Sequence, residues 1–159
     1  MDSLVKSLEL KRQKRSMILV FIAVNFFILS IAGFFHLYWG FGGMWPGRDE
    51  PSLAKAVVGR NGISAMPPKA LTLFVSACLF LASIWPLIWI GLIETPLPYA
   101  VREIGMIGLI VVFIARGIAG YMPNFRRKYS ELPFANYDRQ YYSPLCFMVG
   151  VFSAAIFFL

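Results

Sequence analysis

The sequence predicts an all-α membrane protein, a membrane-spanning four-helix bundle with both termini on the same side of the bilayer. Of its 159 residues, 58% are hydrophobic and 14% are charged, whereas a soluble domain carries about a quarter charged residues. Four apolar stretches are the second observation, and we assign spans to residues 16–38, 70–93, 104–122 and 143–159. About 20 apolar residues in a helix cross a hydrocarbon core, where the backbone must satisfy its own hydrogen bonds.

The first segment, residues 1–15, is a basic N-terminal tail that we expect to be helical, and residues 16–159 form the four-span membrane domain. The first span is too long for a signal peptide, so we expect it to be retained. The net charge of +7 comes from basic residues that flank the spans. This placement predicts the lipid bilayer as partner, with anionic lipid headgroups near the basic tail, and does not suggest nucleic acid.

The two long connections, residues 39–69 and 123–142, lie on the side opposite to the tail. Side A denotes the side of the membrane that holds the tail, and side B denotes the side that holds these two connections. The first connection is rich in Gly and Pro, and we expect a short interfacial helix at residues 52–58 capped by Ser52. Because the basic tail adjoins the first helix, we expect the N-terminus in the cytoplasm. The side B loops carry more basic residues, which favours the opposite orientation.

Helical phase predicts which faces of the spans point into the bundle. At about 100° per residue, small and polar side chains gather on one face of each span, and such faces pack together in membranes. We expect Gly105 and Gly108 on the third span, and Gly150 and Ser153 on the fourth, to pack against neighbouring helices. The corresponding faces of the first two spans hold Asn25, Leu29, Ala32 and His36, and Thr72, Ser76 and Ser83.

Arg116 is a charged side chain inside the third span. A charge near the membrane centre costs at least about 2.5 kcal/mol, and less if the side chain snorkels to the headgroups. Snorkelling is one interpretation. The other is that Arg116, which shares the small-residue face, points inward and needs an acceptor. Asp138 is the best candidate for that acceptor, with Asp49 and Glu50 as alternatives.

A group of polar and aromatic residues marks the side B ends of the spans. His36 is the only histidine, and it is either an interfacial residue beside an aromatic belt or a group that exchanges protons or contacts a ligand. Ser143 and Pro144 are typical of a helix start, with the serine as N-cap. All members of the group belong to side B, so a shared ligand-binding pocket is the hypothesis. Its residues are His36, Tyr38, Trp39, Arg116, Asp138 and Tyr142.

The sequence offers little support for a catalytic or metal centre. A single histidine excludes bis-histidine haem ligation within the chain and a zinc site with several histidines. Cys78 and Cys146 lie inside spans and form no CxxC pair, so we assign them to apolar packing. We therefore expect no catalytic residue, no metal and no cofactor, and an enzyme is the least supported class.

Two aromatic motifs in this order resemble the domain-of-unknown-function 3995 family of small bacterial four-span membrane proteins. The first motif is His36-Leu37-Tyr38-Trp39 followed by Gly42-Gly43. The second runs from Pro133-Phe134-Ala135 through Asp138 to Tyr142-Ser143-Pro144-Leu145-Cys146, and Arg102 precedes the third span between them. The resemblance covers roughly residues 21–159 and implies a four-helix membrane fold, but it implies no activity.

Three classes of function stay open at this point. The first is a multi-pass protein of the bacterial inner membrane that binds a lipid headgroup or a small amphipathic ligand in the side B pocket. The second is an accessory subunit that docks another membrane protein. The third, with less support, is a membrane-embedded enzyme that uses His36 and Asp138 as acid and base.

Overall fold

The protein is all-helical, as the sequence predicts. The computed structural model describes residues 2–159, and side chains from residue 5 onward, so Met1 of the expected tail lies outside the described residues. All regular elements in the described range are helices, in the following order. They are α1 (Asp2–Gly40), α2 (Glu50–Val57), α3 (Lys69–Trp89), α4 (Tyr99–Ala119), α5 (Pro123–Lys128), α6 (Phe134–Tyr137), the π-helix η1 (Asp138–Tyr142) and α7 (Ser143–Phe158).

Three helical segments are long and apolar enough to cross a membrane: Val5–Gly40, Lys69–Trp89 and Phe134–Phe158. The fourth long helix, α4, has 21 residues but carries Arg102, Glu103 and Arg116. The length and apolar character of the first three segments indicate a membrane-embedded protein. That α4 also crosses the membrane stays a prediction.

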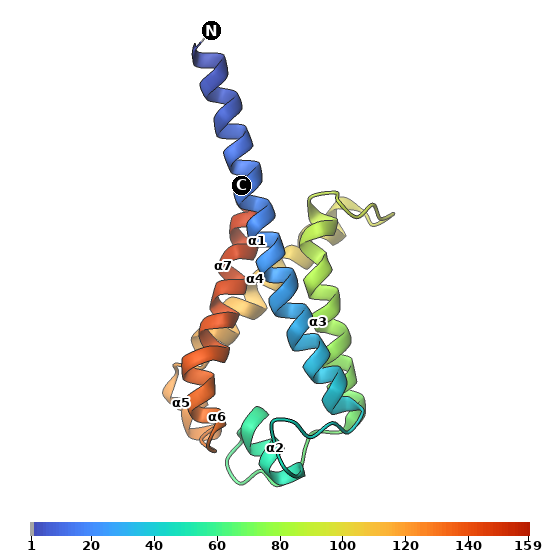
Figure 1. Cartoon of the computed structure of the whole chain (residues 1–159), viewed down its shortest axis with the longest axis vertical. Helices are drawn as coiled ribbons and strands as arrows, with labels where there is room; N and C mark the ends of the chain where they lie inside the picture. Colours follow the sequence, from blue (N-terminus) through green and yellow to red (C-terminus); the bar gives the residue numbers. More distant parts are fainter. Residues whose placement is uncertain (1) are drawn as a thin grey trace.

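Several helix ends differ from the expected spans. The tail and the first span form one continuous helix of 39 residues, about 58 Å long at about 1.5 Å per residue. Its N-terminal part extends beyond the other helices (Figure 1). Helix α3 ends at Trp89 instead of residue 93, and Gly91 beyond it has a φ of 77°, a conformation that favours glycine and ends helices. Helix α4 begins directly after Pro98.

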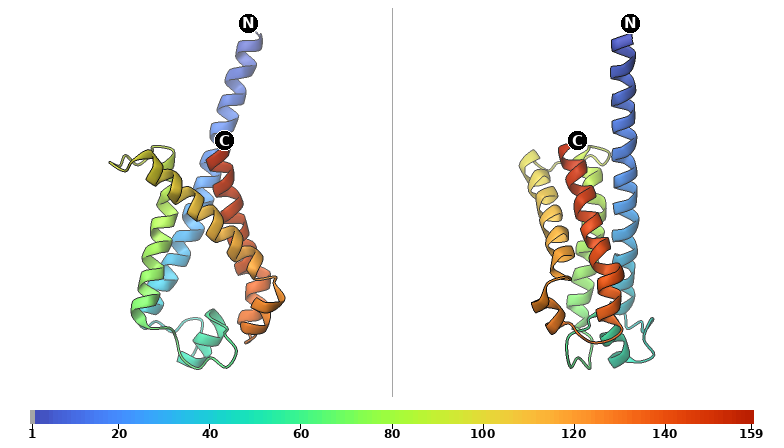
Figure 2. Two further views of the ribbon diagram at one scale, coloured as in Figure 1. Left: turned by 180° about the vertical axis from the view of Figure 1, so that it is seen from behind. Right: turned by 90° about the vertical axis from the view of Figure 1, so that its left-hand side faces the viewer.

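The long helices form two pairs that cross. Helix α3 lies along α1, and α4 lies along α7, with the most extensive contacts of the fold within these pairs. Figure 1 shows the pairs close together near the C-terminus and diverging toward α2, and Figure 2 shows the same divergence from behind. The core accordingly lies where the pairs cross. One cluster is built on Ile22, Met106 and Ile156, and a second on Leu29, Leu109 and Val149, and Trp85 packs against both.

Polar side chains link the helices between these clusters. The Asn25 amide of α1 is fully buried and donates hydrogen bonds to Ser153 Oγ (3.0 Å) and to the Val149 carbonyl (3.3 Å) of α7. In the α1–α3 pair, Ser76 Oγ donates to the Gly33 carbonyl at 2.8 Å. A hydrogen bond in apolar surroundings spares a polar group the cost of lying unpaired, so these contacts specify how the helices meet.

The expected inward face of α4 needs a correction. Gly108 lies on an exposed face, and a Cβ added there would meet open space. Val112 is 61% exposed as well, whereas Met106, Leu109 and Gly117 are buried. The packed face is therefore displaced by about one residue, because the two core clusters need the large side chains of Met106 and Leu109. Gly105 does contact a neighbouring helix, beneath the ring of Trp85.

The two long loops join into one structure, the side B cap, formed by residues 41–68 and 120–142. The Asn61 amide donates to the Lys128 carbonyl (2.9 Å), and the Glu131 amide donates to the Gly59 carbonyl (3.1 Å). Lys55 Nζ lies 3.8 Å from a Glu131 carboxylate oxygen, and the Gly62 amide donates to Glu131 Oε1 at 2.9 Å. The cap thus connects the two helix pairs where their own packing is weakest.

Helix α2 of the cap begins earlier than expected. Asp49, not Ser52, is its N-cap: the Asp49 carboxylate accepts from the Ser52 amide at 2.9 Å, and Ser52 Oγ accepts from the Asp49 amide at 3.1 Å. These hydrogen bonds from Ser52 lower the pKa of Asp49, because they stabilise the charged carboxylate. This short helix is amphipathic, and its buried face, which holds Leu53, Ala54 and Ala56, forms part of the interior of the cap.

The first prediction concerns the membrane topology. Single cysteines at Gln13, Arg48 and Ser130, in a background lacking Cys78 and Cys146, should react with a membrane-impermeant thiol reagent from opposite sides of sealed vesicles. Gln13 should react from side A, and Arg48 and Ser130 from side B, because a crossing by α4 keeps both long loops on one side. Labelling of Arg48→Cys and Ser130→Cys from different sides would contradict a membrane-spanning α4.

The second prediction concerns the α4–α7 contact. A Cβ at Gly150 would lie 2.7 Å from Ile114 Cγ1 and 2.8 Å from its backbone nitrogen, whereas Gly108 has open space. Gly150→Leu should therefore destabilise the protein by about 1–3 kcal/mol through overpacking. Gly108→Leu is a matched control that makes the same change in helix propensity. The thermal midpoint in detergent should fall only for Gly150→Leu, and equal midpoints would show that this contact is not tight.

Candidate functional site

A charged and polar cluster joins the side B ends of α4 and α7. Arg116, in the last turn of α4, forms an ion pair through Nη2 with Asp138 Oδ1, and its Nη1 donates to Ser143 Oγ at 3.2 Å. Ser143 Oγ in turn donates to Asp138 Oδ2 at 3.0 Å. Asp138 and Ser143 are buried, while the Arg116 side chain is 32% exposed. The carboxylate therefore neutralises an arginine that would otherwise be unpaired in low dielectric.

The π-helix η1 explains how Asp138 and Ser143 meet. In an α-helix, residues five apart point about 140° away from each other, because each residue turns the helix by about 100°. In η1 the Ser143 amide donates to the Asp138 carbonyl, the i→i+5 pattern of a π-helix. The wider turn brings both side chains to one face. Ser143 is therefore not the N-cap that the sequence predicts, because the helix continues through it and its hydroxyl contacts Asp138.

Three further residues complete the surroundings of Arg116. A Cβ at Gly120 would collide with Ser143 Oγ, so only glycine leaves room for the cluster at this point of the chain. The guanidinium carbon of Arg116 lies 4.9 Å from the centre of the Phe125 ring, a cation–π contact. Arg126 donates to the carbonyls of Gly120 (3.4 Å) and Ala135 (3.3 Å), which connects α5 and α6 to the end of α4.

A separate aromatic group occupies the side B end of α1. His36 Nδ1 lies 2.8 Å from the Ala32 carbonyl, and because a carbonyl only accepts, this contact needs the proton on Nδ1. Trp39 packs against the His36 ring at 5.1 Å between centroids and donates through Nε1 to the Trp45 carbonyl at 2.8 Å. The Tyr38 hydroxyl accepts from the Trp45 amide at 3.4 Å. This group fastens the start of the cap to α1.

The six residues of the predicted pocket therefore form two groups. His36, Tyr38 and Trp39 belong to the α1–α3 pair. Arg116, Asp138 and Tyr142 belong to the α4–α7 pair with η1. Figure 1 shows the two pairs apart at this end, with α2 between them. One pocket shared by all six residues is thus corrected to an arginine cluster and an aromatic group. Tyr142 packs beside Phe134 at 5.8 Å between ring centroids.

This separation also keeps His36 and Asp138 on different helix pairs, so they do not form the acid–base pair that the enzyme hypothesis needs. Within the described part of the chain, no three His, Cys, Asp or Glu side chains gather in a way that could hold a metal ion.

Sequence reasoning found Arg116 and Asp138 but missed the roles of Ser143, Gly120 and Phe125. No sequence signal marks a π-helix, so the contact across five residues was not predictable.

The third prediction tests the ion pair. Arg116→Ala leaves the buried Asp138 carboxylate without its partner, so it should cost about 2–3 kcal/mol, somewhat less than a fully buried pair because Arg116 is partly exposed. The exposed Arg127 is the control, and Arg127→Ala should change stability by no more than about 0.5 kcal/mol. Thermal unfolding in detergent is the measurement. The double variant Arg116→Ala with Asp138→Ala should cost less than the sum of the single changes, and strict additivity would contradict the pairing.

Comparisons with known proteins bear on the family. A model of the family described as "Protein of unknown function (DUF3995)" matches residues 29–153, which is most of the chain and includes the arginine cluster and the aromatic group. Residues 1–28, which hold the basic tail and more than half of α1, lie outside the match. The chain matches none of the curated proteins and none of the solved structures with which it was compared. The resemblance carried by the two aromatic motifs is confirmed, and the chain belongs to the DUF3995 family of proteins of unknown function.

Proposed function

We propose that this protein is a multi-pass protein of the bacterial inner membrane that binds a lipid headgroup, or a small anionic amphipathic ligand, at Arg116 on side B. The observation that carries the proposal is the partial exposure of the Arg116 side chain, 32% of which is accessible, although the arginine is already paired. An ionisable residue within a membrane span is a candidate functional site by default, because its presence there is costly.

The chemistry of Arg116 supports an anionic ligand. A guanidinium has five N–H donors in a planar fork that matches phosphate and carboxylate groups. Asp138 and Ser143 each accept from one terminal nitrogen of Arg116, which holds the fork in place and leaves other N–H groups for a ligand. The Phe125 ring beneath the guanidinium further restricts its orientation, so a ligand would meet a preorganised donor.

The charge of the surrounding cap points the same way. Asp138 is neutralised by Arg116, and Glu131 is paired with Lys55. The remaining charged residues of the second loop are basic, and they are Arg126, Arg127, Lys128 and Arg139. Tyrosines such as Tyr137 and Tyr141 lie exposed among them, as is typical of the headgroup region. A positive, aromatic surface at this depth favours an anion with an apolar tail.

The fourth prediction tests this function with matched substitutions that keep the charge. The full chain, purified in an uncharged detergent, is titrated with short-chain phosphatidic acid, and bound lipid is followed by native mass spectrometry. Arg116→Lys should weaken binding about tenfold, because a lysine cannot make the same forked hydrogen bonds. Arg127→Lys should leave the affinity unchanged. Equal affinities in the wild type and both variants would contradict a headgroup site at Arg116.

One observation favours the accessory subunit as the second candidate. Gly108 lies among exposed apolar residues of α4, including Ile104 and Val111, and a glycine there lets another helix approach closely. In this alternative, Gly108→Leu abolishes co-purification of a membrane-protein partner while the thermal midpoint stays unchanged. Arg116→Lys would leave such a complex intact, which separates the two candidates.

A further inference from the structure

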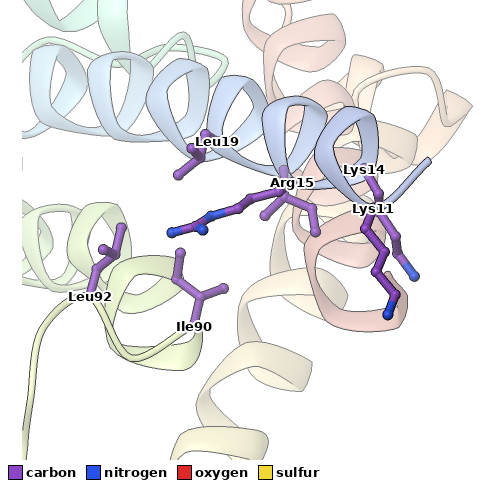
Figure 3. Close-up of a pocket in the computed structure, with 7 residues that line it drawn as sticks. Lys11, Lys14, Arg15, Leu19, Ile90 and Leu92 are labelled. Atoms are coloured by element: carbon purple, nitrogen blue, oxygen red, sulfur yellow. The ribbon is translucent and has the colours of Figure 1, made fainter. Parts of the chain in front are cut away.

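A cleft lies on side A, between the tail part of α1 and the end of α3. Its volume is about 410 Å³, within the range of about 300–1,000 Å³ of small-ligand sites. Three cations line it, Lys11, Lys14 and Arg15, together with four apolar side chains. Figure 3 shows Arg15 reaching from α1 toward Ile90 and Leu92 at the end of α3. The cationic wall belongs to the part of the chain outside the family match.

The three cations share one face of α1 because they stand at positions i, i+3 and i+4. Lys6 and Arg12, the other basic residues of the tail, lie about 100° or more from the centre of this face and do not line the cleft. Among the side chains that the structure describes, none forms a hydrogen bond or an ion pair with Lys11, Lys14 or Arg15. The three cations therefore line the cleft without a partner among the described side chains.

The depth of the cleft matches the boundary of the membrane. Arg15 directly precedes the first apolar span, and Ile90 and Leu92 directly follow α3. Trp89 stacks on Phe157 at 5.0 Å between centroids and contacts Tyr99 at 5.5 Å, an aromatic arrangement typical of the headgroup level. One wall of the cleft therefore lies at the height of lipid phosphates, and the apolar wall faces the hydrocarbon.

We propose that this cleft binds one anionic phospholipid. Its phosphate contacts Arg15 and the neighbouring Lys14 and Lys11, and its acyl chains lie against Ile18, Leu19 and Leu92. A zwitterionic lipid offers the same apolar chains but no net charge to three cations, so the site discriminates by headgroup. Arginine and lysine near a membrane surface attract anionic lipids, and a cleft that holds them beside an apolar wall converts this general attraction into a defined site.

The fifth prediction uses two double variants that lose the same charge from the same tail. Lys14→Gln with Arg15→Gln removes cations of the cleft, whereas Lys6→Gln with Arg12→Gln removes one lysine and one arginine outside it. The full chain in an uncharged detergent is titrated with phosphatidylglycerol or phosphatidylcholine, and bound lipid is counted by native mass spectrometry. The cleft variant should bind phosphatidylglycerol about tenfold more weakly, and the control by less than about twofold. Binding of phosphatidylcholine should not change in either.

A third variant keeps all the cations and blocks the site. Leu92 is 58% exposed, so Leu92→Glu should fold with an unchanged thermal midpoint, pair with Arg15 and repel the lipid phosphate. It should also lower the affinity for phosphatidylglycerol, and excess inorganic phosphate should not displace the lipid from the wild type. Equal losses in the two double variants, equal affinities for the two lipids, or normal binding by Leu92→Glu would each overturn the proposal. The outcome is independent of Arg116, because both double variants retain that residue.

Discussion

The charge of Arg116 is the constraint on which much of this structure depends. An arginine within an apolar helix needs an acceptor, and the acceptor lies on a segment that approaches from the loop after α5. Asp138 reaches the guanidinium while remaining 1% exposed, and the π-helix η1 turns Ser143 to the same carboxylate. Gly120 leaves the space that this arrangement occupies. One ion pair thus links the end of α4 to the segment that leads into α7.

Packing is distributed unevenly along the length of the helix bundle. Both core clusters lie where the helix pairs cross, and Asn25 ties α1 to α7 between them. Toward side B the pairs diverge (Figure 1), and the side B cap connects them through loop hydrogen bonds and the Lys55–Glu131 pair. Loop contacts are weaker than interdigitated side chains. The protein should therefore be most rigid at the crossing and most adaptable at the cap.

The two proposed sites use positive charge in different ways. On side B, Arg116 is paired, oriented and partly exposed, so its selectivity for an anion comes from the geometry of a preorganised fork. On side A, the cations of the cleft have no partner within the described structure, and their selectivity comes from net charge beside an apolar wall (Figure 3). An amphipathic anion suits both sites, because each combines cations with a surface at the edge of the hydrocarbon.

The sequence by itself determined the helical, membrane-embedded class, because long apolar runs have no other economical backbone state in lipid. Periodicity was sufficient for the buried polar faces of α1, α3 and α7. The need of an inward arginine for an acceptor made Asp138 the best of three candidates, and the structure decided among them. The predicted helix contact at Gly108 was wrong. The preference for small residues at helix contacts does not say which face the large side chains of Met106 and Leu109 need. The π-helix, the separation of His36 from Arg116 and the side A cleft were decided by tertiary structure, since each depends on how distant helices meet.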